Sequence, residues 1–241
     1  WRCHFIQKIE SQPNIETHCM HSAFESLRKI DPDDNKFLAW SKGSTGYPFV
    51  DACMRNLISE GWITFRMRAM LVSFASYQLW IDWRLSGNYL AKLFTDFEPG
   101  IHFSQLQMQS GVTGINAMRV YNPIKQSIEH DINGHFIKKW VPELIDLPEK
   151  FIHEPWKYHN NLVDNCSVQI GRDYPFPIVD HEHEARIAKQ KISNVRKNEL
   201  FKYESRLVFE KHGSRKSRSK RKLNTNQKSK VSIDNKQLKL F

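Results

Sequence analysis

The clearest candidate for chemistry is a guanidinium inside an apolar stretch, Arg68. Residues 64–82 are nearly unbroken apolar sequence, and their pattern predicts one helix with apolar side chains on both faces. Such a helix belongs in the middle of a domain, where a buried guanidinium needs an anionic partner. Asp96 and Glu98, just beyond the next predicted helix, are the nearest candidates. The residues alone favour a structural ion pair in a helical core.

A second cluster of chemically active types is Asp-His-Glu-His-Glu at 180–184. Two histidines at i and i+2 point to different faces of a helix, so this pattern favours a polar helix start capped by Asp180 over a metal site. The four cysteines lack the paired spacing of a disulfide framework or zinc site, and we expect a reducing, cytoplasmic location. They are Cys3, Cys19, Cys53 and Cys166.

The net charge of +10 is concentrated at one end of the chain. Residues 211–241 hold eleven Lys and Arg against one acidic residue, Asp234, while the other 25 basic and 25 acidic residues cancel. This tail is poor in aromatics and rich in Lys, Ser and Asn, which is typical of a disordered segment. It is either a solubilising end or an arm that binds the phosphates of DNA or RNA, and the seven basic residues within 211–222 favour nucleic acid.

The elements that must position these residues are helices. The chain is 40% hydrophobic and 12% aromatic, as in a folded globular protein, and no uncharged apolar run is long enough to cross a membrane. Period-2 alternation is absent, so the class is all-α. Residues 1–210 are expected to form one domain and 211–241 a tail. The predicted helices are 1–9, 24–30, 49–59, 64–82, 86–95, 123–130, 135–141 and 181 to about 211.

Residues 99–122 break the helical pattern. Gly100, Gly111 and Gly114, together with glutamines between them, predict an irregular segment or a short helical turn. Such a segment could line a ligand.

A long series of motifs, in order and at matching spacing, resembles the C-terminal catalytic domain of the photolyase/cryptochrome flavoproteins, from residue 1 to about 144. The motifs are Trp1-Arg2, Trp40, Gly43, Thr45-Gly46-Tyr47-Pro48, Asp51, Met54-Arg55, Gly61-Trp62, Arg66, Arg68, Ser73-Phe74, Asp82-Trp83-Arg84, Asp96, Arg119, Asn122-Pro123 and Trp140 to Leu144. The resemblance implies an all-α domain that holds a U-shaped FAD. The family's serine/threonine-rich phosphate loop and its α/β antenna domain would precede Trp1, so we expect either a trimmed piece of a longer protein or a reduced, short form.

In this family, light-excited FAD passes an electron to a pyrimidine dimer flipped out of DNA, and cryptochromes use related photochemistry to signal. The resemblance places six residues at the cofactor: Arg2, Arg68, Asp96, Phe97, Glu98 and His102. It places six others toward the lesion or its phosphates: Trp1, Phe65, Arg66, Met108, Arg119 and Gln126. An aromatic ring can stack on an extruded base and an arginine can hold the backbone, as base flipping requires.

Two departures from the family pattern bear on catalysis. Of the tryptophan relay that carries electrons to the flavin, only Trp83 is present; Leu106 occupies the flavin-proximal position and no tryptophan lies near Ile30. Tyr77 or Trp80 could substitute, though core aromatics need no such role. His102 falls opposite flavin N5, where it could donate a hydrogen bond as a catalytic group, or it is a solvent-facing loop histidine.

Two functions follow. The first is an FAD-dependent, photolyase-type lyase acting on pyrimidine dimers in DNA, single-stranded or double-stranded. The second is a non-repairing, cryptochrome-like photoreceptor or nucleic-acid-binding flavoprotein. We expect a monomer in either case.

Overall fold

The computed structural model describes residues 7, 9–157 and 168–212, and all structural statements below concern these. Within them the secondary structure is helical, apart from one isolated bridge between Ile170 and Tyr174, so the all-α prediction is confirmed. The α-helices are α2 (Asn35–Lys42), α3 (Pro48–Glu60), α4 (Phe65–Ser73), α5 (Trp83–Leu93), α6 (Pro99–Ser110), α7 (Pro123–His130), α8 (His135–Trp140), α9 (His181–Arg196) and α10 (Glu199–His212). The short helical turns are η1 (Pro13–Glu16), η2 (Ser22–Phe24), η3 (Phe74–Gln78), η4 (Pro142–Leu144), η5 (Glu149–Phe151) and η6 (Pro155–Lys157).

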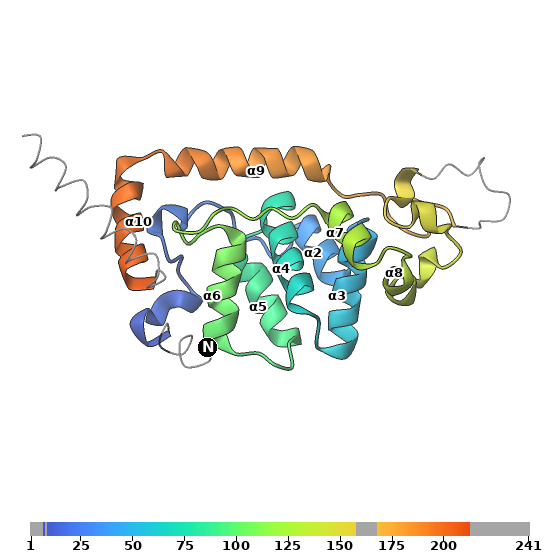
Figure 1. Cartoon of the computed structure of the whole chain (residues 1–241), viewed down its shortest axis with the longest axis horizontal. Coiled ribbons are helices and arrows are strands. Elements are labelled where there is room, and N and C mark those ends of the chain that lie inside the picture. The colour runs from blue at the N-terminus through green and yellow to red at the C-terminus, as the bar shows by residue number, and fades with distance from the viewer. Residues whose placement is uncertain (1–6, 8, 158–167, 213–241) are drawn as a thin grey trace, which may run out of the picture.

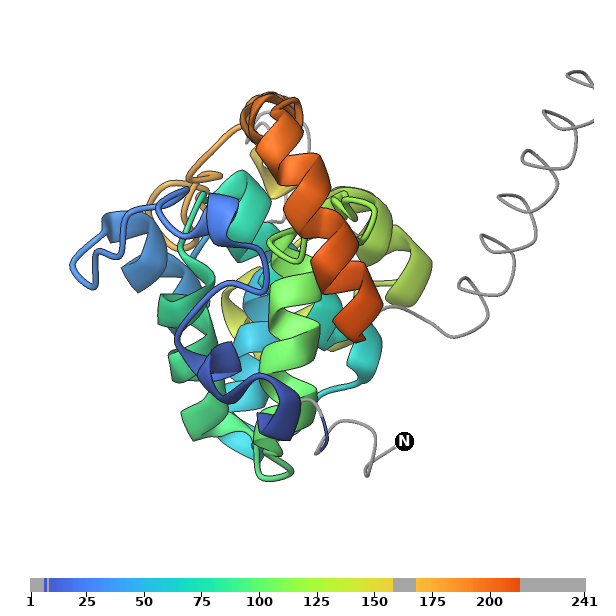
Figure 2. The ribbon, with the colours of Figure 1, turned by 90° about the vertical axis from the view of Figure 1, so that its left-hand side faces the viewer.

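Helices α2 to α6 form a bundle with α9 laid across one end of it (Figure 1). α10 turns back along the side that carries residues 13–24, as the second view shows (Figure 2). The centre of the bundle is aromatic: Trp40, Trp83 and Tyr77 are fully buried. Burial of such large apolar rings is the main stabilising contribution in a fold of this kind. No helix in the described part of the chain is long and apolar enough to cross a membrane.

The helix predicted over 64–82 is present as far as Gln78 but is not a regular α-helix after Ser73, and residues 79–82 are not helical. α4 is regular only to Ser73, and the next turn is a π-helix in which the Leu79 amide donates to the Phe74 carbonyl. Trp80 then adopts a φ of +59°, which ends the helix. The indole of Trp80 lies between two cations, with the Arg28 and Lys191 groups 4.4 and 4.6 Å from ring centroids. This packing holds the backbone in an otherwise unfavourable conformation.

Arg28 is a buried cation that the sequence did not reveal. Its Nε donates to the Ser76 carbonyl and its Nη2 to the Ser110 carbonyl, at the C-terminal ends of η3 and α6. The negative ends of two helices therefore face this charge, which offsets part of its desolvation. Burial still lowers the pKa of Arg28 to about 10.

Residues 99–122 are predicted to be an irregular segment or a short helical turn; residues 111–122 are irregular, but residues 99–110 form the regular helix α6. Glu98 caps its start by accepting hydrogen bonds from the Gly100 and Ile101 amides, with Pro99 in the first turn. Gly111 ends it at a φ of +76°. Proline at the first position and glycine just past the last are the usual boundaries of a helix, so these residues delimit α6 instead of breaking it.

The single closing helix predicted at about 181–211 is two helices. Asp180 caps α9 as predicted, accepting from the Glu182 and His183 amides. The chain turns at residues 197–198, where the Asn198 side chain accepts from the Leu200 amide and starts α10. α10 docks because the Phe201 ring stacks on the buried His21 ring at a centroid separation of 4.0 Å.

Polar contacts reinforce that docking. The Ser22 amide and hydroxyl both donate to the Glu204 carboxylate, at 2.7 and 2.6 Å. Val208 packs with Ile15 and Met20 in a small separate apolar cluster. α10 is therefore part of the folded body, and the predicted tail falls outside the described residues from position 213 on.

The Thr-Gly-Tyr-Pro motif leads into α3 through a buried carboxylate. Asp51, fully buried, accepts from the Thr45 amide at 2.8 Å, the Thr45 hydroxyl at 2.7 Å and the Gly46 amide at 3.1 Å, and also from the Tyr174 hydroxyl. A buried carboxylate is tolerated when its oxygens are hydrogen-bonded. This network fixes α3 to the loop before α9.

Candidate functional site

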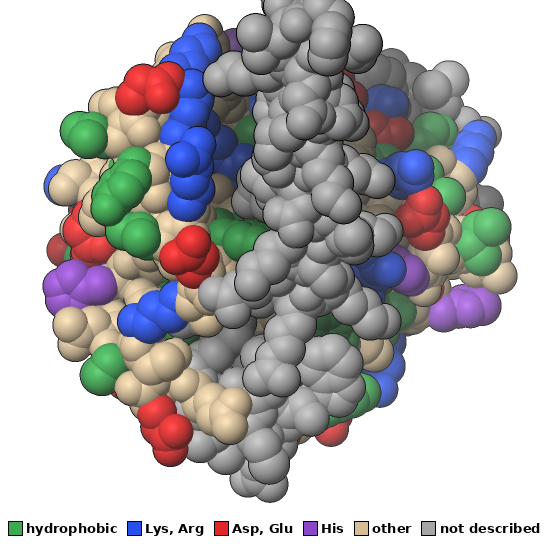
Figure 3. Space-filling view, turned by 60° about the vertical axis from the view of Figure 1, so that its left-hand side comes forward, with side chains coloured by type: hydrophobic (Ala, Val, Ile, Leu, Met, Phe, Trp, Pro, Cys, Tyr) green, Lys and Arg blue, Asp and Glu red, His purple; other side chains and the backbone are tan. Residues whose placement is uncertain are grey.

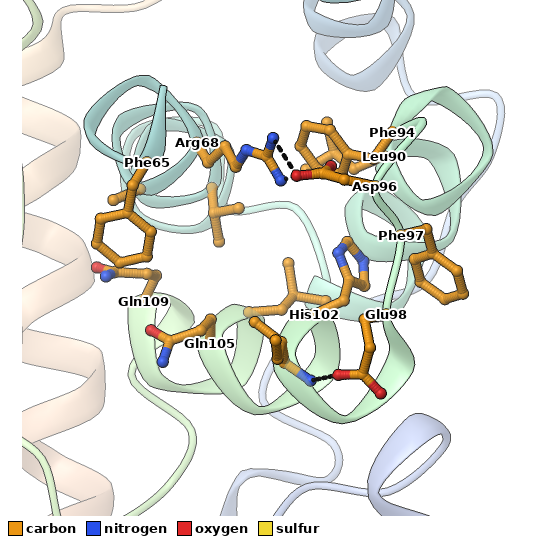
Figure 4. Close-up of a pocket in the computed structure, with 14 residues that line it drawn as sticks. Phe65, Arg68, Leu90, Phe94, Asp96, Phe97, Glu98, His102, Gln105 and Gln109 are labelled. Atoms are coloured by element: carbon orange, nitrogen blue, oxygen red, sulfur yellow. Dashed lines mark hydrogen bonds and ion pairs between the residues drawn. The ribbon is translucent and has the colours of Figure 1, made fainter. Parts of the chain in front are cut away.

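A cavity of about 150 Å³ opens between α4, α5 and α6. Figure 4 shows its walls: Arg68 reaches from α4 toward Asp96, Phe65 lies on one side, and His102 and Glu98 lie on the other. The remaining lining residues are mostly apolar or neutral: Ala69, Val72, Leu90, Phe94, Phe97, Ile101, Gln105, Leu106 and Gln109. A mainly apolar cavity with a few fixed polar groups is the usual form of a cofactor site.

The predicted ion pair of Arg68 and Asp96 is present. Two parallel hydrogen bonds of 3.0 Å join Nη1 to Oδ1 and Nη2 to Oδ2, and the Arg68 Nε donates to the Ile63 carbonyl at 2.9 Å. The guanidinium also lies 4.2 Å from the Phe94 ring centroid. A planar group with these contacts is held in one orientation.

The sequence suggested that this pair lies in a dry interior, but the structure places it at the cavity wall. The Arg68 side chain is 23% exposed and the Asp96 side chain 50% exposed, because both form part of the cavity wall. A two-point pair at an open wall is available to a ligand, whereas a pair sealed in the core would have only a structural role.

His102 is a partly buried cavity residue on α6, so the alternative of a solvent-facing loop histidine is wrong. Its Nε2 lies 2.9 Å from the Gly87 carbonyl, and because a carbonyl can only accept, this nitrogen carries the proton in the neutral ring. Three phenylalanine rings surround the imidazole at centroid separations of 5.0 to 6.0 Å. Burial and the nearby Arg68 charge lower the pKa of His102.

Neutral His102 therefore has an acceptor nitrogen, Nδ1, left over. The predicted donation of a hydrogen bond from His102 to flavin N5 requires a proton on Nδ1, which the lowered pKa disfavours. Acceptance from an N–H group of a ligand is the role that the observed Gly87 contact favours.

Close packing of α5 and α6 shapes the back of the cavity. A Cβ placed on Gly87 would lie 2.1 Å from Leu106 Cδ2, so Leu106 fits only because position 87 has no side chain. Leu106, the position at which the resemblance implies a relay tryptophan, contributes an apolar wall.

These residues fit the ring end of FAD. Flat apolar walls, a fixed guanidinium–carboxylate pair and a sheltered acceptor suit a planar heterocycle with N–H and C=O edges. Gln105 Oε1 and both amide atoms of Gln109 are buried without a hydrogen-bond partner in the described structure, and such atoms need a partner. Arg68 is the only Lys or Arg among the described lining residues, and it is already paired with Asp96. The lining therefore offers no free cation for the diphosphate of FAD.

The cavity brings together six of the predicted site residues: Phe65, Arg68, Asp96, Phe97, Glu98 and His102. Trp1 and Arg2 lie outside the described residues. Arg66 and Arg119 are both exposed, and the two segments that carry them are in contact. The Arg66 guanidinium lies 5.9 Å from the Tyr121 ring centroid, and the Arg119 carbonyl accepts a hydrogen bond from the Ser73 hydroxyl. Neither lines the cavity.

Three predicted residues lie elsewhere. Gln126 is 7% exposed on α7 and donates to Glu129, so it has no open face toward a lesion. Met108 is partly buried on α6 and is not among the lining residues. Trp83 is fully buried with its indole N–H donating to the Cys19 sulfur at 3.2 Å. Its electron-transfer role stays a prediction.

The two glutamines of the lining, Gln105 and Gln109, are not among the predicted site residues. With His102 and Leu106 they follow i, i+3, i+4, i+7 spacing and share one face of α6. This signal is visible only once 99–110 is recognised as a helix. Phe94, beneath Arg68, is predicted only as part of an apolar helix face, and its place at the site follows from tertiary packing.

Comparison with known proteins assigns the family. Residues 1–194 match the model of the FAD binding domain of DNA photolyase. A deoxyribodipyrimidine photo-lyase of Alkalihalophilus pseudofirmus is 37% identical over 78% of this chain and 40% of its own length. Cryptochrome-2 of Arabidopsis thaliana is 36% identical over 71% of this chain and 28% of its own length.

The fold agrees. A crystal structure of a class III photolyase from Agrobacterium tumefaciens superimposes with a TM-score of 0.74 at 30% identity, covering 82% of this chain and 41% of that one. The chain thus spans about 40% of the length of the photo-lyases that it matches. FAD, the cofactor that the resemblance implied, is the one that the family model names. By sequence, fold and the cavity between α4 and α6, the chain belongs to the family of the FAD binding domain of DNA photolyase.

Proposed function

We propose that this chain binds FAD in the cavity between α4, α5 and α6 and acts as a photolyase-type flavoprotein on pyrimidine dimers in DNA. The observation that carries the proposal is the Arg68–Asp96 pair on the wall of an open, mostly apolar cavity. When bound, FAD would supply the light-driven electron that splits the dimer. The relatives that support this activity are named deoxyribodipyrimidine photo-lyases, and the match covers about 40% of their length.

The residues of this chain have defined tasks in that proposal. Arg68 and Asp96 present a donor and an acceptor edge in one plane, which orients a heterocycle bound beside them, and Phe94 supports the guanidinium from beneath. His102 accepts one N–H through Nδ1. Leu90 and Leu106 exclude water from the ring face, which strengthens the polar contacts nearby. Trp83 is the candidate for electron transfer.

Phe65 is placed to meet the substrate. Its side chain is 64% exposed although it lines the cavity, so it stands at the mouth. An exposed ring beside a cavity can stack on an extruded base, and the exposed Arg66 and Arg119 can hold strand phosphates. Lys and Arg side chains also form a row on one face of the body, among acidic and apolar ones (Figure 3).

The test is a spectrum followed by a repair assay. Purified protein is scanned for flavin absorption, then illuminated with reductant and an oligonucleotide that contains a pyrimidine dimer. Flavin absorption and restored thymines support the proposal. Absence of flavin absorption, also after incubation with added FAD, contradicts both parts of it.

A second candidate is a cryptochrome-like photoreceptor without repair activity. The absence of a tryptophan at position 106 favours it, because the usual electron route to the flavin then lacks its first ring. Flavin that is photoreduced without any repair of the oligonucleotide would distinguish this candidate from the first.

A further inference from the structure

The sequence that follows α10 falls into two parts of different chemistry. Residues 213–230 contain eight Lys and Arg and one hydrophobic residue, Leu223. Residues 231–241 contain five hydrophobic residues among eleven, and the chain ends in Gln-Leu-Lys-Leu-Phe at 237–241, here called the terminal peptide. Binding to phosphates accounts for the composition of the first part. It does not account for three large apolar side chains in the last four positions.

The structure fixes the place at which this segment leaves the folded body. Phe201 stacks on His21, and Val208 packs with Ile15 and Met20, so α10 is held against the body over its length. Residues 213–236 join α10 to the terminal peptide. A coil of that length has an r.m.s. span of roughly 27 Å, which is enough to bring the terminal peptide to a partner beside the body.

The terminal peptide has the pattern of a short ligand for a groove on a protein. Leu238 and Leu240 alternate with Lys239, so in an extended peptide both leucines point to one side and the lysine to the other. Phe241 adds a large ring at the end, and the Gln237 amide offers a donor and an acceptor before the first leucine. Extended peptides are recognised in this way, with alternate side chains inserted into apolar pockets.

One apolar face of the described body competes for the terminal peptide. Leu200, Tyr203 and Leu207 are 75, 62 and 48% exposed and follow i, i+3, i+7 spacing on α10. They form a ridge on the convex surface of one helix, whereas a peptide that inserts alternate side chains requires pockets. A groove on another protein is therefore favoured, and docking on α10 is an outcome that the experiment detects.

The charge of the connecting segment indicates where that protein lies. Eight Lys and Arg between α10 and the terminal peptide suit the phosphates of a nucleic acid, which places the peptide beside DNA. A ring protein that encircles duplex DNA and slides along it carries its surface to any position on the duplex. A peptide bound to such a ring would keep the body close to DNA by raising its effective concentration there.

We propose that residues 237–241 are a docking peptide for a sliding clamp, the ring protein that encircles DNA during replication. Leu238, Leu240 and Phe241 enter an apolar groove of the clamp, and the Gln237 amide makes hydrogen bonds at its edge. The proposal takes from the proposed function only that DNA is the common ligand. It does not involve FAD, so the flavin content should not change when the terminal peptide is altered.

The experiment is calorimetric titration of the full chain with a purified bacterial sliding clamp in the absence of DNA. A bacterial clamp is the probe because photo-lyases similar to this chain come from bacteria. We expect a Kd of about 1–10 μM, as for a short peptide with three anchors. The double variant Leu240→Ala with Phe241→Ala should bind at least about tenfold more weakly.

A matched double variant tests the location. Leu223→Ala with Val231→Ala removes two apolar side chains of the same tail outside the terminal peptide, and it should change the Kd less than about twofold. Both double variants keep every Lys and Arg, so a difference between them does not come from charge. The Kd should also change little between about 50 and 200 mM salt, whereas binding through the basic residues would weaken steeply.

Three results would overturn the proposal: no binding of the clamp by the full chain, equal losses in the two double variants, or a Kd that rises steeply with salt. Hydrogen exchange tests the competing face. Faster exchange in α10 after truncation at Lys236 would show that the terminal peptide docks on Leu200, Tyr203 and Leu207 and would also overturn it. Absence of flavin would contradict the proposed function but would leave clamp binding unchanged, so the two proposals fail separately.

Discussion

Arg68 on α4 and Asp96 in the α5–α6 connection, 28 residues apart, form a two-point ion pair at the wall of an open cavity. Phe94 lies beneath the guanidinium and the Ile63 carbonyl accepts from its Nε. Three independent contacts therefore fix one planar group, and the carboxylate, half exposed, keeps oxygen surface for a ligand.

Asp96→Asn should reduce flavin content more than stability. The substitution keeps the shape of the side chain but removes the negative charge opposite Arg68, so affinity for FAD should fall tenfold or more, about 1.5–3 kcal/mol. The unfolding free energy should change by less than about 1 kcal/mol because the pair is partly exposed. The flavin-to-protein absorbance ratio and urea unfolding measure the two effects. Asp146→Asn, at an exposed position, is the control.

His102 should make folding stability depend on pH. Its pKa is lowered in the folded state by burial, so the unfolded chain binds more protons as the pH falls below about 6.5. The contribution of neutral His102 to the unfolding free energy is fully present above that pH and is lost as the pH falls through the folded-state pKa. His102→Gln should remove this part of the acid sensitivity. Melting temperatures of both proteins between pH 5 and 8 test it, and parallel curves would contradict it.

Phe201→Ala should release α10, while Leu200→Ala should not. Phe201 is 6% exposed and stacks on His21, whereas its neighbour Leu200 is 75% exposed. Loss of the buried ring should cost about 3 kcal/mol or more, and the exposed leucine less than about 0.5 kcal/mol. Hydrogen exchange should accelerate in residues 13–24 only for Phe201→Ala. Unchanged exchange there would show that α10 is not held by this contact.

Tyr174→Phe should weaken the anchor of α3. The variant removes one donor to the buried Asp51 carboxylate and should cost about 1–3 kcal/mol of unfolding free energy. Asp51→Asn should cost as much or more, and the double variant should be less destabilised than the sum, because both act on one network. Additive effects in this cycle would contradict the coupling.

Truncation after His212 should leave folding and pigment intact while reducing the salt dependence of nucleic-acid binding. The removed residues are the basic tail beyond α10, and each lysine or arginine that no longer neutralises a phosphate makes the slope of log affinity against log salt less steep. Binding measured between about 50 and 200 mM salt, where a large change is expected, tests this. An unchanged slope would show the tail to be inert.

Much of the fold was predictable because its signals are local. The helix of Pro48–Glu60 has an apolar stripe and a terminal glycine, and Asp180 caps α9 at the position that the sequence predicts. The pairing of Arg68 with Asp96 followed from charge burial and from family resemblance. For the two helices, one short stretch of sequence contains the cause; for the ion pair, the resemblance supplied the partner that charge burial demanded.

Tertiary contacts decided what the sequence did not reveal. The π turn depends on the packing of Trp80 between Arg28 and Lys191, which come from segments before and after it. The bend before α10 depends on His21, 180 residues from Phe201.

The wrong prediction at α6 has a different origin. Glycines inside a helical pattern usually indicate a break, but here Gly111 follows the last residue of the helix. Glu98 and Pro99 occupy the matching positions at its start. The number of glycines in this segment therefore predicts a loop, whereas the order of Glu98, Pro99 and Gly111 along the chain predicts a helix between them.

The π turn at 74–78 inserts one residue between Arg68 and Trp80 relative to a regular helix of the same rise. Deleting one residue there would rotate Gln78 and Trp80 about the axis and away from α9, while Arg68, upstream, would keep its orientation. This single wide turn therefore sets the direction in which Gln78 and Trp80 face relative to Arg68.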